Sequence, residues 1–179
     1  MRAVLGQQIA VPTAIRLAAK LVARFGEPLR NLDPALTHVF PVPKALAGAN
    51  LSTLGMPLRR AVTLSAVTAA VVADPLIFAA GRSLQEAVTQ LRTLPGIGEW
   101  TAQYIAMRQL REPDAFPAAD IGLMRAMGGS EGLRPSASEL LARAERWRPW
   151  RAYAAQHLWA SKRLTPTSKR SEPGVSGVM

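Results

Sequence analysis

The chain has 179 residues and no cysteine, which excludes disulfides, thiolate nucleophiles and cysteine-ligated zinc or iron–sulfur clusters. It carries 22 Lys and Arg against 12 Asp and Glu, and the net charge of +10 favours a polyanionic partner such as nucleic acid. The hydrophobic content of 49% is typical of a chain that folds into one or two compact domains. His38 and His157 lack the spacing of metal ligands, so we expect no bound metal.

We expect neither a membrane span nor a signal peptide. The longest apolar stretch, residues 61–73, falls short of the roughly 20 residues that cross a bilayer, and we predict a buried core helix there. Residues 1–25 are Ala-rich and contain no acidic residue, a composition that an amphipathic transit peptide would share. We predict a soluble cytoplasmic protein.

Prolines and capping residues divide the chain into short predicted helices. Pro12 and Pro57 suit the first turns of helices, and Ser83 and Ser136 each stand three positions before a glutamate, which is the capping-box pattern. The predicted helices span residues 12–25, 44–49, 57–72, 83–94, 136–147 and 149–163, and two more begin near residues 99 and 120. Apolar and polar residues nowhere alternate over four or more positions, so we predict no sheet.

These elements predict an all-α fold of about eight to ten helices in residues 1–163. We expect one compact unit, built as two helical lobes around a cleft, with a helical hairpin at about residues 91–104. Residues 164–179 are typical of a disordered tail, because TPTSKRSEPGVSGVM from Thr165 onward has little that could be buried.

The hairpin is the most informative segment. A predicted helix ends at Leu94, Pro-Gly-Ile-Gly makes a tight turn, and a new helix follows Gly98. Gly96 and Gly98 tolerate positive φ and carry no Cβ atom that would keep another backbone away, so unpaired N–H groups could reach a phosphate. The pattern predicts DNA-backbone contact through Leu94, Gly96, Gly98 and Thr101, although an ordinary connection between two helices can also contain Gly-x-Gly.

Five segments occur in an order that is typical of one family. They are LGQQI at residues 5–9, LGMP at 54–57, LPGIGEWTA at 94–102, FPAAD at 116–120, and AERWRPWRAY at 144–153 continuing to residue 159. In these segments the chain resembles the DNA-3-methyladenine glycosylase II branch of the helix-hairpin-helix glycosylase superfamily, over residues 1–163.

The resemblance implies a fold, an activity and a partner. The partner would be double-stranded DNA with alkylated bases, and the reaction would be cleavage of the N-glycosidic bond by a monomer that needs no cofactor. Such an enzyme would act on the nucleoid DNA of a bacterium. Members of the family often carry an N-terminal β-rich domain, and we expect this chain to lack it.

Asp120 is the predicted catalytic residue. At the start of a predicted helix, the ordinary role of an aspartate is that of an N-cap, and the two roles are compatible. The resemblance implies that Asp120 is the family's essential aspartate, which would stabilise the positive charge that develops on the sugar and orient the attacking water. The Gly-Pro that often precedes this aspartate is replaced here by Ala118-Ala119.

Three aromatic residues are the predicted substrate-binding residues. The resemblance implies that Trp100, Tyr104 and Trp159 line the base pocket, where cation–π attraction would add about 0.5–2 kcal/mol for a positively charged alkylated purine. Trp100 and Tyr104 lie at i and i+4 on one helix face, a spacing that ordinary cores also use. We interpret Trp147 and Trp150 as packing residues.

Two further residues complete the expectation. Superfamily members that also nick the strand carry a lysine at the place of Trp100; tryptophan forms no Schiff base, so the chain is predicted to be a monofunctional hydrolase without lyase activity. Gln8 falls where the family places the residue that fills the gap left by a flipped base, although a surface glutamine without a role is the alternative.

Three competing interpretations of the chain stay open. They are a non-catalytic helix-hairpin-helix DNA-binding module, an inactive fragment and a membrane-surface helical protein.

Overall fold

The computed structural model describes residues 1–30, 33–79, 81–128 and 133–164. In these ranges the chain forms nine α-helices and no strand; the residues Pro28 and His38 make a single isolated β-bridge. The all-α prediction is confirmed. Of the predicted tail, Leu164 is the last residue of α9 (Arg151–Leu164), and residues 165–179 lie outside the described part of the chain.

The first lobe is built from four helices and a 3-10 turn. They are α1 (Arg2–Leu5), α2 (Val11–Phe25), α3 (Pro43–Ala47), η1 (Leu51–Leu54) and α4 (Leu58–Ala73). Prolines occupy the first turns of α2 and α3, as expected from a residue that needs no N–H partner there. The helix α1 contacts α2, α4 and α6, so this short element joins the first lobe to the second.

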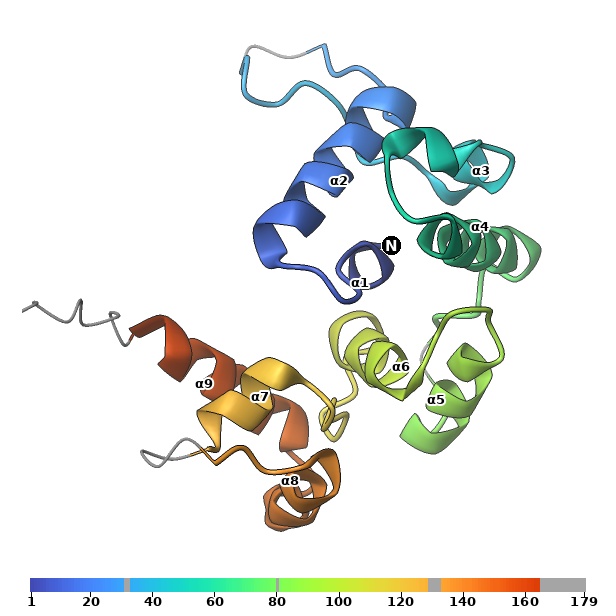
Figure 1. The fold of residues 1–179 in the computed structure, drawn as a ribbon. Coiled ribbons are helices and arrows are strands. Elements are labelled where there is room, and N and C mark those ends of the chain that lie inside the picture. Colours follow the sequence, from blue (N-terminus) through green and yellow to red (C-terminus); the bar gives the residue numbers. More distant parts are fainter. Residues whose placement is uncertain (31–32, 80, 129–132, 165–179) are drawn as a thin grey trace, which may run out of the picture.

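The second lobe contains the hairpin. Its elements are α5 (Leu84–Arg92), α6 (Glu99–Ile105), a π-helical turn η2 (Ala106–Leu110), α7 (Ile121–Ala126), α8 (Ala137–Ala144), a 3-10 turn η3 (Glu145–Trp147) and α9. Figure 1 shows α5 and α6 beside α7–α9, with α1–α4 above both groups. The two lobes that we predicted from the sequence are therefore confirmed.

Both predicted capping boxes are present. The Ser83 hydroxyl accepts a hydrogen bond from the backbone N–H of Glu86, and the Ser136 hydroxyl accepts one from Glu139. Each glutamate in turn accepts a hydrogen bond from the backbone N–H of its serine, and these bonds lower the pKa of both carboxyl groups. The N-termini of α5 and α8 are thus encoded locally, which explains why the sequence revealed them.

An ion-pair network fixes the loop that leads to α7. Arg151 is only 5% exposed, and its guanidinium donates to the Asp114 carboxylate at 2.7 and 2.9 Å and to Glu145 at 3.0 Å. Arg148 pairs with the same two acids, and its hydrogen bond holds the pKa of Glu145 below its ordinary value. A buried guanidinium needs such partners, so the network ties the loop before Asp120 to the start of α9.

The two tryptophans that we interpreted as packing residues differ. Trp147 meets Phe116 edge to face, with ring centroids 6.0 Å apart, and packs against the core as predicted. The prediction is wrong for Trp150, whose side chain is 57% exposed and contacts Tyr153. Trp150 precedes the first residue of α9, and the residues buried at that end of the helix are Arg151, Ala152 and Ala155.

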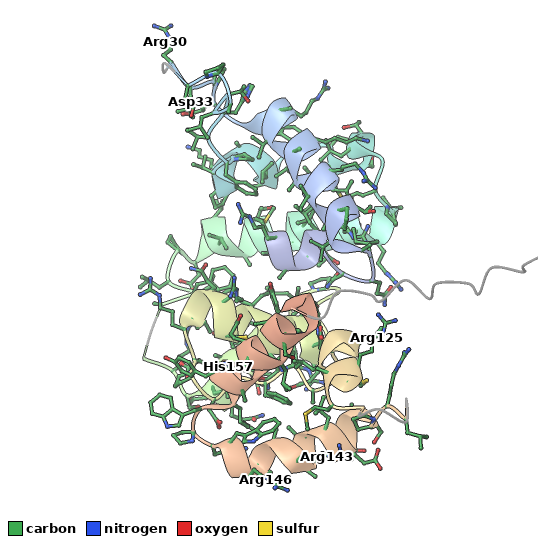
Figure 2. The ribbon with its side chains drawn as sticks, turned by 90° about the vertical axis from the view of Figure 1, so that its left-hand side faces the viewer. Arg30, Asp33, Arg125, Arg143, Arg146 and His157 are labelled. Atoms are coloured by element: carbon green, nitrogen blue, oxygen red, sulfur yellow. The ribbon has the colours of Figure 1, made fainter. Side chains whose placement is uncertain are left out.

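Three arginines project from the surface of the second lobe. Figure 2 shows Arg125, Arg143 and Arg146 projecting from α7, α8 and η3, and all three are exposed. No helix among the described residues is both long enough and apolar enough to cross a bilayer.

Candidate functional site

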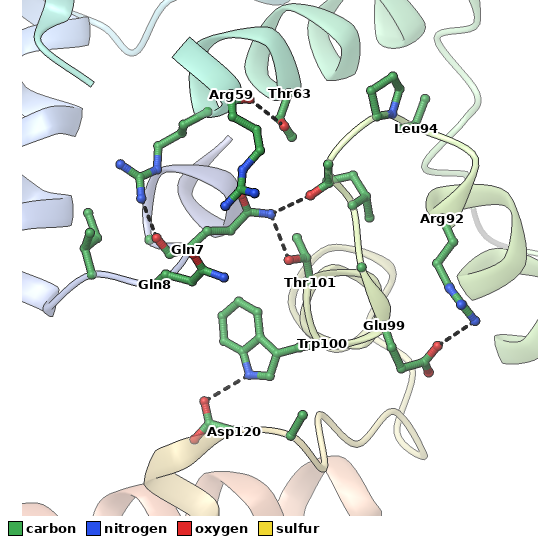
Figure 3. A pocket seen from close by; sticks show the side chains of 18 of the residues that line it. Gln7, Gln8, Arg59, Thr63, Arg92, Leu94, Glu99, Trp100, Thr101 and Asp120 are labelled. Atoms are coloured by element: carbon green, nitrogen blue, oxygen red, sulfur yellow. Dashed lines mark hydrogen bonds and ion pairs between the residues drawn. The ribbon is translucent and has the colours of Figure 1, made fainter. Parts of the chain in front are cut away.

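A cleft of about 1370 Å³ separates the two lobes, and Figure 3 shows the side chains around it. Its walls are formed by residues 6–10 after α1, the start of α4, residues 92–101 of the hairpin, and residues 119–122 at the start of α7. The cleft therefore brings together the predicted Gln8, hairpin and Asp120, which lie far apart in the sequence.

The two hairpin glycines have different roles. Gly96 has φ +79°, and a Cβ atom there would lie 1.9 Å from the Thr63 hydroxyl oxygen, so a side chain is excluded by the close packing of the hairpin on α4. Gly98 has φ −89°, and a Cβ atom there would meet nothing within 4 Å. Of the two glycines that tolerate positive φ, only Gly96 adopts it, whereas Gly98 leaves open space beside the hairpin.

The other two hairpin residues predicted to contact DNA are more enclosed. Leu94 is half-buried at the edge of the cleft and packs against the core. Thr101 is only 4% exposed, and its hydroxyl accepts a hydrogen bond from Gln7 Nε2 at 3.0 Å. Thr101 thus stabilises the hairpin from the buried side, through its hydrogen bond with Gln7.

Gln7 is a site residue that the sequence analysis missed. Its Nε2 also donates to the carbonyl oxygen of Gly96 at 2.9 Å, and its own backbone carbonyl accepts a hydrogen bond from Arg60 of α4. One amide therefore connects the segment after α1 to the hairpin turn and to the first turn of α6. The Gln7-Gln8 pair was visible in the sequence, but nothing in it indicated which glutamine holds the hairpin.

Gln8 is exposed and borders the cleft. Its φ of +54° is uncommon for a residue other than glycine. Figure 3 shows its side chain at the open space that Trp100 also borders. An unusual backbone conformation at the edge of a cleft is consistent with a functional constraint on this residue.

Asp120 is half-buried and caps α7. Its Oδ1 accepts hydrogen bonds from the backbone N–H of Leu123 and from Trp159 Nε1, each at 2.9 Å, and its Oδ2 accepts one from Trp100 Nε1 at 3.0 Å. The N-cap geometry is confirmed, and the same carboxylate borders the cleft, so capping leaves it available for chemistry.

The three predicted aromatic residues form one cluster. Trp100 and Tyr104 are stacked with ring centroids 5.3 Å apart, and Tyr104 meets Trp159 at 6.0 Å. Trp100 borders the cleft, whereas Tyr104 and Trp159 are not among its lining residues and lie behind Trp100 and the carboxylate. Gly122 was also missed, and a Cβ atom there would lie 2.9 Å from Asp120 Oδ1 and 3.3 Å from Trp159 Cδ1.

The charges at the cleft are mainly basic. Arg59, Arg60 and Arg92 border it, and Arg92 pairs with Glu99 at 3.0 Å on the exposed side of the hairpin. Within the described ranges, no group of three or more His, Asp or Glu side chains is arranged to hold a metal ion.

The packing of the hairpin predicts opposite outcomes for its two glycines. Gly96→Ala should lower the free energy of unfolding by about 2 kcal/mol or more, because alanine disfavours positive φ and its methyl group would collide with Thr63. Gly98→Ala should change it by less than about 1 kcal/mol. Chemical denaturation of the three proteins measures both values, and equal effects would contradict the geometry.

Comparison with known proteins gives consistent matches. Residues 1–152 match the family described as HhH-GPD superfamily base excision DNA repair protein. The chain is 44% identical over 161 residues to the "Probable bifunctional transcriptional activator/DNA repair enzyme AlkA" of Mycobacterium tuberculosis. This alignment covers 90% of the chain and 32% of the relative. It is 35% identical over 169 residues to DNA-3-methyladenine glycosylase 2 of Escherichia coli, over 93% of this chain and 57% of the relative.

A solved structure agrees with the sequence matches. The 3-methyladenine DNA glycosylase of Archaeoglobus fulgidus superposes with a TM-score of 0.78 and 28% identity, over 91% of this chain and 57% of that one. The chain thus spans between about a third and somewhat more than half of the length of these relatives. The predicted resemblance to the DNA-3-methyladenine glycosylase II branch is confirmed, and the chain belongs to the HhH-GPD superfamily of base excision DNA repair proteins.

Proposed function

We propose that this protein is a DNA glycosylase that hydrolyses the N-glycosidic bond of alkylated bases, of the 3-methyladenine type, in double-stranded DNA. The observation that carries the proposal is the Asp120 carboxylate, which is half-buried and borders the same cleft as the hairpin and Gln8. The two relatives and the solved structure with glycosylase or repair names support the reaction type.

The hairpin would hold the DNA backbone. The open space at Gly98 allows a phosphate to approach the turn closely, and Arg59 at the cleft edge adds positive charge. Contacts of this kind set the position of a duplex without reading its sequence. A protein that searches for damaged bases in any sequence context needs such contacts.

The cleft would then receive a base that has left the stack. Extruding a base costs a few kcal/mol, and the exposed Gln8 would occupy the gap in the duplex. Trp100, with Tyr104 and Trp159 behind it, would offer aromatic surface to a positively charged alkylated purine. Selection would depend on charge and on an already weakened glycosidic bond.

Asp120 would act on the sugar. As the bond from C1′ to the base breaks, its electron pair leaves with the base, and positive charge builds on the deoxyribose. A carboxylate held beside this charge stabilises it, and the same group can orient the water that adds to C1′ and releases a proton to solvent. The products would be a free base and an abasic site, and the reaction uses no cofactor.

The absence of lyase activity belongs to the same proposal. Strand cleavage in this superfamily requires an amine that forms a Schiff base with the sugar, and the residue at that place is Trp100. We further expect a monomer that acts on nucleoid DNA in the bacterial cytoplasm. A non-catalytic DNA-binding module or an inactive fragment would keep the hairpin but have no use for Asp120.

The first prediction from the proposed function concerns DNA binding. A protein that neutralises about three phosphates loses about 40-fold in affinity between 50 and 200 mM salt, and we expect at least this loss for duplexes of any sequence. Gly98→Val should weaken binding by about tenfold, because its side chain fills the space in which a phosphate would lie. Fluorescence anisotropy measures both.

A matched control is Gly48→Val. A Cβ atom at Gly48 also meets nothing within 4 Å, but this residue caps α3, outside the cleft. Gly48→Val should keep the affinity of the wild type. A flat salt dependence, or an equal loss for both variants, would contradict hairpin binding.

The second prediction concerns catalysis. Asp120→Asn should reduce the release of bases from methylated DNA by at least about 100-fold, because the charge that stabilises the transition state is lost. Asparagine is also a good N-cap, so the fold and the DNA affinity should be retained. The control is Asp74→Asn, which alters an aspartate that accepts from the Leu76 N–H outside the cleft. A variant at position 120 with most of the wild-type rate would reject the catalytic assignment.

The third prediction concerns the product. The wild-type protein should leave intact strands that contain abasic sites, and alkali should cleave them. Borohydride should trap no covalent protein–DNA adduct, because the Trp100 indole N–H is not a basic amine. A trapped adduct in purified protein would show that an amine reaches the sugar, and it would overturn the monofunctional assignment.

A further inference from the structure

We propose that the indole N–H groups of Trp100 and Trp159 position the Asp120 carboxylate, so that its Oδ2 atom is the oxygen that acts on the sugar. This assignment rests on the proposed glycosylase function and deepens it. It gives two aromatic residues a role toward the carboxylate, separate from any contact with a base.

The hydrogen bonds distinguish the two carboxylate oxygens. Oδ1 receives two donors, the Leu123 backbone N–H and Trp159 Nε1, each at 2.9 Å. Oδ2 receives one donor, Trp100 Nε1, at 3.0 Å. A carboxylate offers about four lone-pair positions, so one position is left by the described residues, and it belongs to Oδ2.

The location of the donors indicates which oxygen faces the cleft. Leu123 is fully buried, and neither it nor the half-buried Trp159 borders the cleft, so both donors to Oδ1 lie away from the cleft. Trp100, the donor to Oδ2, does border the cleft, and Figure 3 shows its indole directed at Asp120. The oxygen with the spare lone pair is therefore the one on the substrate side.

The Oδ1 side of the carboxylate is tightly packed. A Cβ atom at Gly122 would come within 2.9 Å of Oδ1 and 3.3 Å of the Trp159 ring, so only glycine leaves room for this arrangement. Tyr104 lies against both indoles, stacked on Trp100 and tilted against Trp159. The directions of the two N–H groups are thus set by ring packing, independent of any bound base.

The arrangement favours one mode of catalysis. Hydrogen bonds from three donors spread the negative charge of a carboxylate and make it a weaker nucleophile, while they hold it in one orientation. A group fixed in this way stabilises developing positive charge without reorganising during the reaction. Asp120 would therefore act by electrostatics and by orienting water at Oδ2, without forming a covalent bond to the sugar.

Replacement of each tryptophan by phenylalanine separates the two roles, because phenylalanine keeps an aromatic face and lacks the N–H. We expect Trp159→Phe and Trp100→Phe to lower the single-turnover rate of base release by about 10- to 100-fold. The larger loss is expected for Trp100→Phe, since Oδ2 then keeps no donor. Affinity for a duplex with a neutral tetrahydrofuran abasic analogue should stay within about threefold of the wild type.

A second measurement reports on the carboxylate directly. A duplex with a cationic pyrrolidine at the abasic position mimics the charged sugar, so the ratio of its affinity to that of the tetrahydrofuran duplex reflects the charge held beside C1′. Both phenylalanine variants should lower this ratio, and Asp120→Asn should abolish the preference for the cationic duplex. Adding Trp159→Phe to Asp120→Asn should cause no further loss, because the two changes act on one group. Trp147→Phe, a packing change away from Asp120, should leave the ratio unchanged.

The outcomes separate this assignment from the function on which it rests. Equal losses from Trp159→Phe with aspartate or asparagine at position 120 would overturn the positioning role, as would a proportional loss of affinity for the neutral duplex. If the wild type released no base and showed no preference for the cationic duplex, the glycosylase function itself would be rejected, and this assignment with it. Circular dichroism of each variant verifies the fold.

Discussion

The Asp120 carboxylate is the interaction on which the site depends. It ends the loop before α7, and its hydrogen bonds to Trp100 and Trp159 bring α6 and α9 to the same point. A half-buried carboxylate requires such donors, since leaving it unpaired would cost several kcal/mol. These hydrogen bonds lie where α6, α7 and α9 meet, and the cleft borders that point.

The helix α6 connects this point to the first lobe. Successive residues on a helix point about 100° apart, so Trp100 and Thr101 face different partners. Trp100 donates to Asp120, while the buried Thr101 hydroxyl accepts from Gln7 of the first lobe. Gln7 also donates to the Gly96 carbonyl. The positions of the hairpin turn, of the open space at Gly98 and of the carboxylate are therefore all linked to the short helix α6. A DNA backbone bound at the turn would thereby be placed at a fixed distance from Asp120.

The features that the sequence predicted are the local ones. The capping boxes at Ser83 and Ser136 specify helix starts by contacts within three residues, and both starts are found. Pro12 lies in the first turn of α2 as predicted, whereas the helix predicted from Pro149 begins at Arg151. Helix ends were less accurate, since α5 stops at Arg92 and α8 yields to a 3-10 turn at Glu145. The family resemblance located Asp120 and the aromatic residues. The contacts of Gln7, Gly122 and Arg151 depend on partners brought near by the fold, and no spacing rule reveals them. Nor does Gly-x-Gly indicate which glycine has positive φ.

The loop before α7 is fixed by contacts with two helices. It is fixed at Asp114 by Arg151, at the Phe116 N–H by the Gln103 side chain, and at Asp120 by the two indoles. Each of these anchors comes from α6 or α9, the same helices that carry the tryptophans, so the loop and the donors to its carboxylate share one frame. Ordering this segment costs conformational entropy of the backbone, and this free-energy cost arises during folding, not during the reaction. Electrostatic stabilisation is strongest when the stabilising group is already oriented, and under the proposed function this loop would hold Asp120 in that condition before DNA binds.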